Sequence, residues 1–328
     1  MLAYAVRRVL ISIPILLVAT FIVFLLVSLS GDPLANLKTK QPKVPEQTIK
    51  LAEHRLRLDQ PLLERYWHWI TGVIHGNFGP SVAGGGTLDI GTEILHRALV
   101  TLRLVFFAMV LAALIAIVVG VISATKQYSR LDYSFTFTGF LFLAMPTFWF
   151  AILLKEGAIW SNVHMGTKFK TISENSPNIS PGFSAHLFDD FNHLILPTIT
   201  LALISYAAWS RFNRASMIEA LTSDYIRLAR AKGISPSRVL IRHALRTALI
   251  PFVTVTALDI GAILGGAIIT EYIYQWRGMG DFLLQDGLNN YDPYVVLAWL
   301  LVAGGAVILF NLIADLLYGV LDPRIRYE

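Results

Sequence analysis

The strongest chemical signal in the sequence is a basic stretch between two apolar segments, from Arg211 to Thr247. Gly233 is expected to end one helix and Ser235-Pro236 to begin another, which predicts a helix–turn–helix hairpin. This charge pattern suits an anionic lipid surface, an RNA or a groove on a partner protein. The first helix is expected to present Tyr225, Leu228 and Ala229 on one face and Arg227, Arg230 and Lys232 on the other.

A second candidate is Asp259, a carboxylate ten residues into the otherwise uncharged segment from Leu249 to Thr270. At about 1.5 Å per residue it lies near the middle of that segment, where a charge is costly unless it is paired or hydrated. Asp259 could face a polar path between helices and hold a cationic group there, or it could hydrogen-bond to a neighbouring helix. Gly261, Gly265 and Gly266 follow it and permit close helix packing, or leave room for a molecule in that path.

Several kinds of site are excluded or not expected. The chain has no cysteine, which rules out disulfides, thiol catalysis, iron–sulfur clusters and Cys-type zinc sites. No His-x-x-x-His pair occurs, so no metal site is expected. No paired carboxylates or Ser/His/Asp set have workable spacing, and the string from Gly120 to Lys126 lacks the second glycine of a phosphate-binding loop. We therefore expect neither an enzyme nor a cofactor bound by this chain.

The elements that position these residues are membrane spans. Of the 328 residues, 55% are hydrophobic and only 15% charged, which is too apolar for a soluble protein. About 20 apolar residues cross a bilayer, and six segments qualify, so the sequence predicts an all-α integral membrane protein with six transmembrane helices. The expected parts are helix 1 (1–31), an insertion (32–96), a core (97–319) and a tail (320–328). Within the core, helices are expected at about 101–125, 133–157, 194–213, 249–270 and 293–318, and a loop at 214–247.

The distribution of Lys and Arg predicts the orientation. Fourteen of them fall at the two ends and in the second and fourth connections, whereas the short turn between the last two spans has only Arg277. The positive-inside rule then places both termini in the cytoplasm, and the basic excess indicates topology rather than nucleic acid. The insertion is expected outside, with its helix Leu62 to His75 on the membrane surface, under a partner, or packed on its own spans. Lys155 is expected to snorkel at the outer interface, next to a loop of little regular structure from Trp160 to His193.

The stretch from Asp224 to Pro251 resembles the "EAA" loop of ABC importer permeases, in the version typical of oligopeptide and dipeptide permeases. Arg227-Leu228-Ala229 occupies the Glu-Ala-Ala position, Gly233 the signature glycine, and His243-Ala244-Leu245-Arg246 the ending. The resemblance extends over nearly the whole chain. It includes Gly31-Asp32-Pro33, Leu58-Asp59-Gln60-Pro61-Leu62, Met145-Pro146-Thr147-Phe148-Trp149, His193-Leu194-Ile195-Leu196-Pro197, Gly278-Met279-Gly280 and Leu321-Asp322-Pro323-Arg324-Ile325-Arg326.

The resemblance implies a type I ABC importer permease fold with an extracytoplasmic helical insertion after the first helix. It implies a multi-pass subunit of a prokaryotic plasma membrane that forms half of the path for short peptides. The implied partners are a second, homologous permease, two cytoplasmic ATPase subunits that bind ATP and Mg²⁺, and an external substrate-binding protein. The residues that would couple to the ATPases are Asp224, Tyr225, Arg227, Ala229, Arg230, Ala231, Lys232 and Gly233.

Two alternatives for the function stay open. Relatives of this kind also carry nickel chelates, glutathione or other small cargo. A secondary transporter driven by an ion gradient belongs to a different class, and it would favour two inverted halves and several buried acids. Only Asp259 lies clearly mid-membrane and no internal repeat is visible, which favours the importer.

Overall fold

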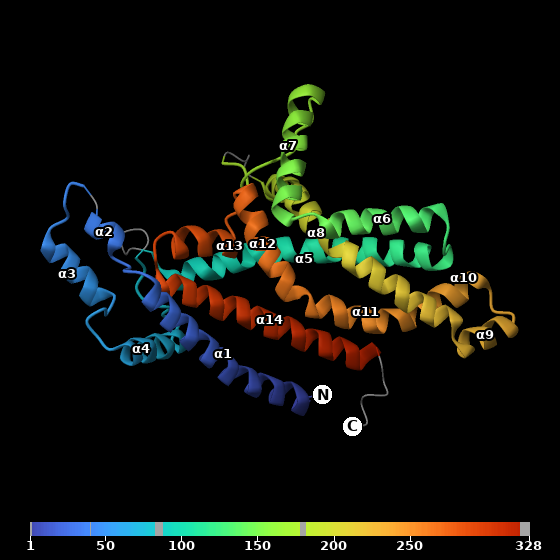
Figure 1. Ribbon diagram of the computed structural model, residues 1–328, viewed down its shortest axis with the longest axis horizontal. Coiled ribbons are helices and arrows are strands. Elements are labelled where there is room, and N and C mark those ends of the chain that lie inside the picture. Colours follow the sequence, from blue (N-terminus) through green and yellow to red (C-terminus); the bar gives the residue numbers. More distant parts are fainter. Residues whose placement is uncertain (1, 40, 83–87, 178–181, 322–328) are drawn as a thin grey trace. The chain divides into compact units, whose positions relative to one another are not determined.

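The computed structural model of the chain describes residues 2–39, 41–82, 88–177 and 182–321 (Figure 1). In these ranges the regular elements are helices, and β-type pairing is limited to one isolated bridge between Pro80 and Asp89. The expected all-α architecture is therefore confirmed. Most of the expected tail, residues 322–328, and the glycine run within 83–87 lie outside the described residues.

Five helices of the described chain are long and apolar enough to cross a membrane, and a bent helix pair brings the number of spans to six. This agrees with the six spans predicted from hydropathy. The spans lie in α1 (Leu2–Ser30), α5 (Ile90–Thr125), α6 (Arg130–Ala144) with α7 (Thr147–Met165), α8 (Phe183–Thr222), α10 to α11 (Pro236–Arg238, Val239–Leu245, Arg246–Leu258) and α14 (Pro293–Leu321).

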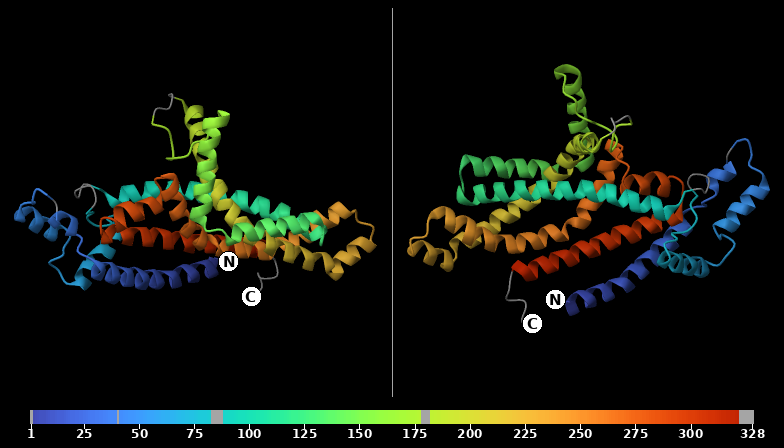
Figure 2. Two further views of the ribbon diagram at one scale, coloured as in Figure 1. Left: turned by 45° about the horizontal axis from the view of Figure 1, so that its top comes forward. Right: turned by 180° about the vertical axis from the view of Figure 1, so that it is seen from behind.

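The third span is not the single helix expected over about 133–157. It breaks between α6 and α7, whose axes differ by 106°. Pro146 precedes α7 with φ −60° and ψ 137°, and Met145 before it is also extended. A proline lacks the N–H that would continue the hydrogen-bond ladder, and it disfavours helical angles in the residue before it. Figures 1 and 2 show α7 running away from α6 beyond this bend.

The helix expected over 249–270 is also interrupted, at Asp259. The residue separates α11 from α12 (Ile260–Tyr274), although its φ of −76° and ψ of −6° stay close to helical values. Its N–H still donates to the carbonyl of Val255 at 3.1 Å, and its own carbonyl accepts from Ile263 at 3.0 Å. The segment expected as one helix over 249–270 is thus divided between α11, which ends the apolar span Pro236–Leu258, and the shorter α12.

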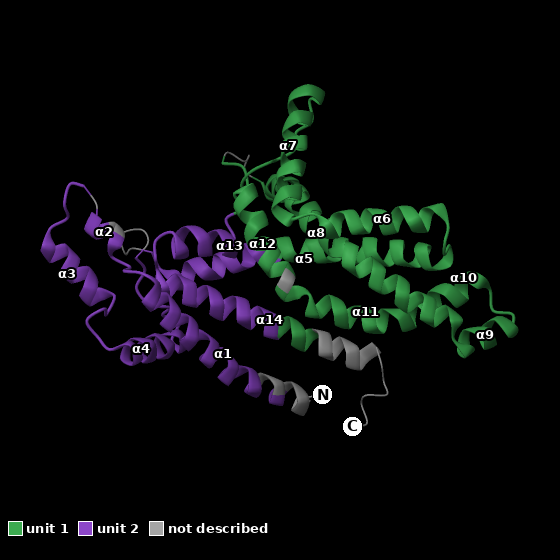
Figure 3. Ribbon diagram, viewed as in Figure 1, with its two compact units in different colours: residues 1, 103–276, 309–328 green, residues 2–102, 277–308 purple. Residues whose placement is uncertain are grey.

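The chain divides into two compact units (Figure 3). The second unit comprises Leu2–Leu102 and Arg277–Ile308, and it contains α1, α2 (Ala35–Thr39), α3 (Glu46–Arg55), α4 (Leu62–Ile74), α13 (Met279–Asp281) and the π-helix η3 (Phe282–Leu288). The helix α4 packs on α1, since the Tyr66 ring lies 5.1 Å from that of Phe21 and its hydroxyl 2.9 Å from that of Thr20. The helix expected from Leu62 to His75 therefore packs on its own span and leaves Leu63, Trp67 and Ile74 exposed.

The first unit contains Arg103–Trp276 and the chain from Leu309 onward. Its centre is α8, which packs against α6, α7, α11 and α12. This helix begins at Phe183 and ends at Thr222, so it extends the expected span of 194–213 at both ends. The loop expected from Trp160 to His193 is correspondingly shorter, because α7 continues to Met165.

Candidate functional site

The basic hairpin forms directly at the end of α8. Ser223 adopts an extended conformation, with φ −68° and ψ 154°, and its carbonyl accepts from the N–H groups of Ile226 and Arg227 at 3.2 Å. These bonds start α9 (Asp224–Ala231), a helix of eight residues. Asp224 in its first turn and Arg230 in its last turn have the charges that a helix dipole favours. The sequence prediction of a short helix at this position is confirmed.

Gly233 ends the helix in the left-handed region, with φ +75°. Its N–H donates to the carbonyl of Arg230 at 3.0 Å, and that of Ile234 donates to Ala229 at 3.3 Å. A Cβ in this conformation costs about 1–2 kcal/mol, so glycine is the residue that allows this tight end. The chain then re-enters a helical path at Pro236, where a proline is favoured in the first turn.

One side of α9 is buried in its own unit. Ile226 is fully buried and Ala229 is 7% exposed. They belong to an apolar cluster, here called the anchor cluster, that fixes α9 to the ends of three longer helices and to η2 (Val239–Leu245). The other members of the anchor cluster are Ala124 of α5, Met217 and Ala220 of α8, Val239 and Ala244 of η2, and Ala248 of α11.

The opposite side of α9 is free. Tyr225 is 41% exposed and Leu228 57% exposed, and both lie beside the exposed basic residues. Arg227 contacts Asp224 at 3.4 Å, and both side chains are largely in solvent. Tyr225, Leu228 and Ala229, which were expected on one face, therefore do not all lie on the same face. Ala229 packs inward with Ile226 and is not available to a partner groove, whereas Ala231 is exposed.

Asp259 is bound by a neighbouring helix. The indole Nε1 of Trp209 in α8 donates to its Oδ2 at 2.7 Å, and the Trp209 side chain is 1% exposed. The same indole packs edge to face on Phe252 of α11, with ring centroids 6.2 Å apart. This geometry favours the interpretation of Asp259 as a group that holds two helices together.

The three glycines beyond Asp259 differ in their surroundings. Gly266 faces Leu201 of α8, since a Cβ on it would lie 3.7 Å from a methyl of that leucine. Gly261 is exposed, and a Cβ on Gly265 would meet no described atom within 4 Å. Only Gly266 therefore serves packing within the described chain, and the other two lie on a surface open to another helix.

Two features near the 166–182 loop were not expected from the sequence. Lys155 does not simply snorkel, because its ammonium donates to the carbonyl of Ile273 in the last turn of α12 at 2.7 Å. His193 is 5% exposed and its Nδ1 lies 2.9 Å from the carbonyl oxygen of Ser173, while Nε2 lies 3.2 Å from Oγ of Ser176. The two contacts of His193 tie Ser173 and Ser176 of the loop to α8. Among the described residues no group of three or more His, Asp or Glu could hold a metal ion.

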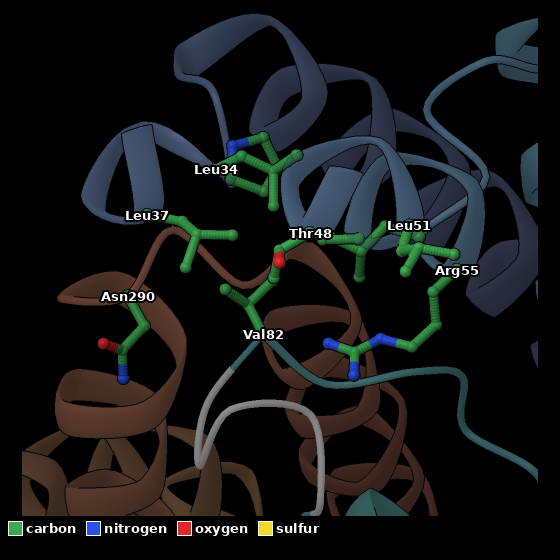
Figure 4. Close-up of a pocket in the computed structure, with 10 residues that line it drawn as sticks. Leu34, Leu37, Thr48, Leu51, Arg55, Val82 and Asn290 are labelled. Carbon is green, nitrogen blue, oxygen red and sulfur yellow. The ribbon is translucent and has the colours of Figure 1, made fainter. Parts of the chain in front are cut away.

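A pocket of about 530 Å³ lies in the second unit (Figure 4). Its walls come from α2, α3 and the segments that follow α4 and η3, and they are mainly apolar. Arg55 is tied to the wall, since its Nη2 donates to the carbonyl of Ser81 at 3.3 Å. The labelled residues that line the pocket are Leu34, Leu37, Thr48, Leu51, Arg55, Val82 and Asn290.

Comparisons with known proteins agree with this architecture. Residues 116–327 match the family described as binding-protein-dependent transport system inner membrane component, and residues 1–86 match its N-terminal companion. The chain is 38% identical over 327 residues to an oligopeptide transport system permease protein, OppB, of Mycobacterium tuberculosis, with 99% of each chain covered. It is 36% identical over 342 residues to the dipeptide transport system permease protein DppB of Escherichia coli, with 100% of each covered.

A solved structure supports the fold. An inward-facing form of the MetNI methionine ABC transporter superposes with a TM-score of 0.55 at 18% identity, covering 70% of this chain and 97% of that one. The likeness concerns the fold alone, while the family follows from the sequence matches over almost the whole chain. The chain, with its membrane spans and the hairpin that follows α8, belongs to the family of binding-protein-dependent transport system inner membrane components.

Proposed function

We propose that the chain is a permease subunit of an ATP-driven importer of short peptides and forms half of the translocation path. The observation that carries the proposal is α9, a short helix fixed to its own spans on one side and exposed on the other. The names of the relatives, which are oligopeptide and dipeptide permeases matched over almost their full length, support peptides as the cargo over nickel chelates or glutathione.

The geometry of α9 explains how separate ATPase subunits could drive the chain. An amphipathic helix binds through side chains three and four positions apart, and Tyr225 and Leu228 have that spacing. Because Ile226 and Ala229 are buried in the anchor cluster, a force on α9 reaches α5, α8 and α11 rather than bending a loop. Closure of the ATPases would then move these spans as one body. ATP and Mg²⁺ belong to those partners.

Two further partners follow from the same proposal. A second, homologous permease would complete the path, and the exposed Gly261 and Gly265 allow a helix of that subunit to approach closely. An external substrate-binding protein would deliver the peptide on the side opposite to α9. The complex would lie in a prokaryotic plasma membrane, surrounded by lipid, with both termini of this chain in the cytoplasm.

Reconstitution tests the cargo and the energy source. The chain is co-expressed with its partner subunits, and uptake of labelled di- to oligopeptides into proteoliposomes is measured with ATP, without ATP, and with an imposed ion gradient. We expect uptake only with ATP, ATPase subunits and binding protein together. Uptake of nickel chelate or glutathione in place of peptides would correct the cargo, and uptake driven by the gradient alone would contradict an ATP-driven importer.

Cysteine labelling tests the orientation. The chain has no cysteine, so the single substitutions Ser237→Cys, Thr48→Cys and Asn289→Cys each give one labelled site, and all three residues are exposed. A membrane-impermeant maleimide added to intact cells should label the second and third variants and leave the first unlabelled until the cells are opened. Labelling of Ser237→Cys in intact cells would reverse the proposed orientation.

A further inference from the structure

An ion pair between a buried carboxylate and a partly exposed guanidinium ties α6 to α8 close to the hairpin. Arg214 donates from Nε to Oδ1 of Asp132 at 2.9 Å and from Nη2 to Oδ2 at 2.8 Å, so the pair is bidentate. The N–H of Tyr128, in the turn between α5 and α6, also donates to Oδ2 at 3.0 Å. Asp132 is 3% exposed. Two parallel charged hydrogen bonds fix both the distance between the two side chains and their relative orientation, whereas a single contact does not fix the orientation.

The residue next to Arg214 ties α8 to α5. Asn213 is fully buried, and its Nδ2 lies 3.4 Å from the carbonyl of Ala116 and 3.3 Å from that of Ile117. Gly120 lies directly against it, because a Cβ there would come within 2.6 Å of the same nitrogen and 3.1 Å of the N–H of Arg214. The two helices therefore approach as closely as a glycine permits, and α5, α6 and α8 are joined at one level.

The place where α5, α6 and α8 are joined lies close to α9. Arg214 precedes the end of α8 at Thr222 by about two turns, or roughly 12 Å at about 1.5 Å per residue. Between them, Met217 and Ala220 carry the anchor cluster that holds α9. A displacement of α9 passes to α8 through apolar packing. From α8 it passes to α6 at the Asp132–Arg214 pair, and α6 is the first half of the bent third span.

We propose that Asp132 and Arg214 are positioning residues that couple the movement of α9 to the third span. This inference rests on the proposed function, because it assumes that ATPases act on α9. Apolar contacts between α6 and α8 allow sliding, whereas a bidentate pair holds one register. Without it, α9 and α8 move while α6 lags, so ATP is hydrolysed with little cargo moved.

The test compares two conservative substitutions in the complete complex. Arg214→Lys keeps the charge and loses the planar bidentate geometry. Arg211→Lys is the matched control, since Arg211 lies one turn earlier and its guanidinium lies 4.5 Å from the ring of Phe140 in α6, a contact that a lysine can also make. For each variant, assembly of the complex is measured by co-purification. ATP hydrolysis and peptide uptake are then measured in the same proteoliposomes.

For Arg214→Lys we expect normal assembly, hydrolysis within about twofold of the parent, and uptake lower by about tenfold, as for the loss of one charged hydrogen bond. Arg211→Lys should match the parent in all three. Asp132→Asn, like Arg214→Lys, should raise the amount of ATP hydrolysed per peptide transported. Equal falls in hydrolysis and uptake, or unchanged uptake, would overturn the coupling role. Absence of ATP-dependent uptake in the parent complex would instead reject the proposed function.

Discussion

Replacing Leu228 with glutamate is expected to abolish ATP-driven uptake while the chain still folds and inserts. Leu228 lies at the centre of the exposed face of α9 and is 57% exposed, so the change should alter the free energy of unfolding by no more than about 0.5 kcal/mol. In an apolar partner groove the same carboxylate would lose its hydration where the leucine is accommodated. A cost of about 2.7 kcal/mol or more lowers the affinity for the ATPase at least about a hundredfold.

Two controls make this result specific. Leu288→Glu introduces the same change at a leucine that is 48% exposed in η3, far from α9 along the chain, and it should leave ATPase binding intact. Ile226→Glu places the charge in the anchor cluster and should reduce the amount of folded protein instead. Co-purification of the ATPases measures binding, and melting of the detergent-solubilised chain measures folding. Normal ATPase binding by Leu228→Glu would show that this face is not the contact.

The position of α9 could be predicted, but its orientation could not. Helix ends depend on local chemistry, so Gly233 and Pro236 mark the hairpin in the sequence alone. The helix has apolar residues on more than one side, namely Tyr225 and Leu228 on one and Ile226 on another. Which side turns inward is decided by the shape of the anchor cluster, whose members come from α5, α8, η2 and α11. Such non-local contacts are not visible in an eight-residue pattern.

The membrane spans, too, could be located from the sequence, while some of their details could not. Hydropathy averaged over about 20 residues locates each span, but the averaging hides the break at Pro146, although that proline was a readable signal. The first turns of α8 were hidden for another reason. There Phe183 and Phe188 are exposed while His193 is buried, so the polar side faces the protein. A pattern that assumes polar residues outside assigns this segment to a loop.

The largest effect inside the membrane is expected for Trp209→Phe. The substitution removes the indole that donates to Asp259 and leaves the carboxylate without this 2.7 Å hydrogen bond. A hydrogen bond to a charged group contributes about 1.5–3 kcal/mol, and an unpaired carboxylate in a span adds to the loss. Asp259→Asn should be milder, since the amide oxygen accepts the same bond and carries no charge. The double variant should be more stable than Trp209→Phe alone.

Melting of the solubilised complex measures these differences, and Trp299→Phe is the matched control. Its indole Nε1 is buried and has no hydrogen-bond partner in the described chain, so this substitution changes the same atoms without losing a bond. It should therefore shift the melting temperature less than Trp209→Phe. Uptake then separates the two roles of Asp259. If the carboxylate joins α8 to the fifth span, Asp259→Asn lowers uptake of cationic and anionic peptides equally, in proportion to the complex that assembles. A loss confined to cationic peptides, with assembly unchanged, would show that Asp259 faces the path, because only a group that contacts the cargo can distinguish its charge.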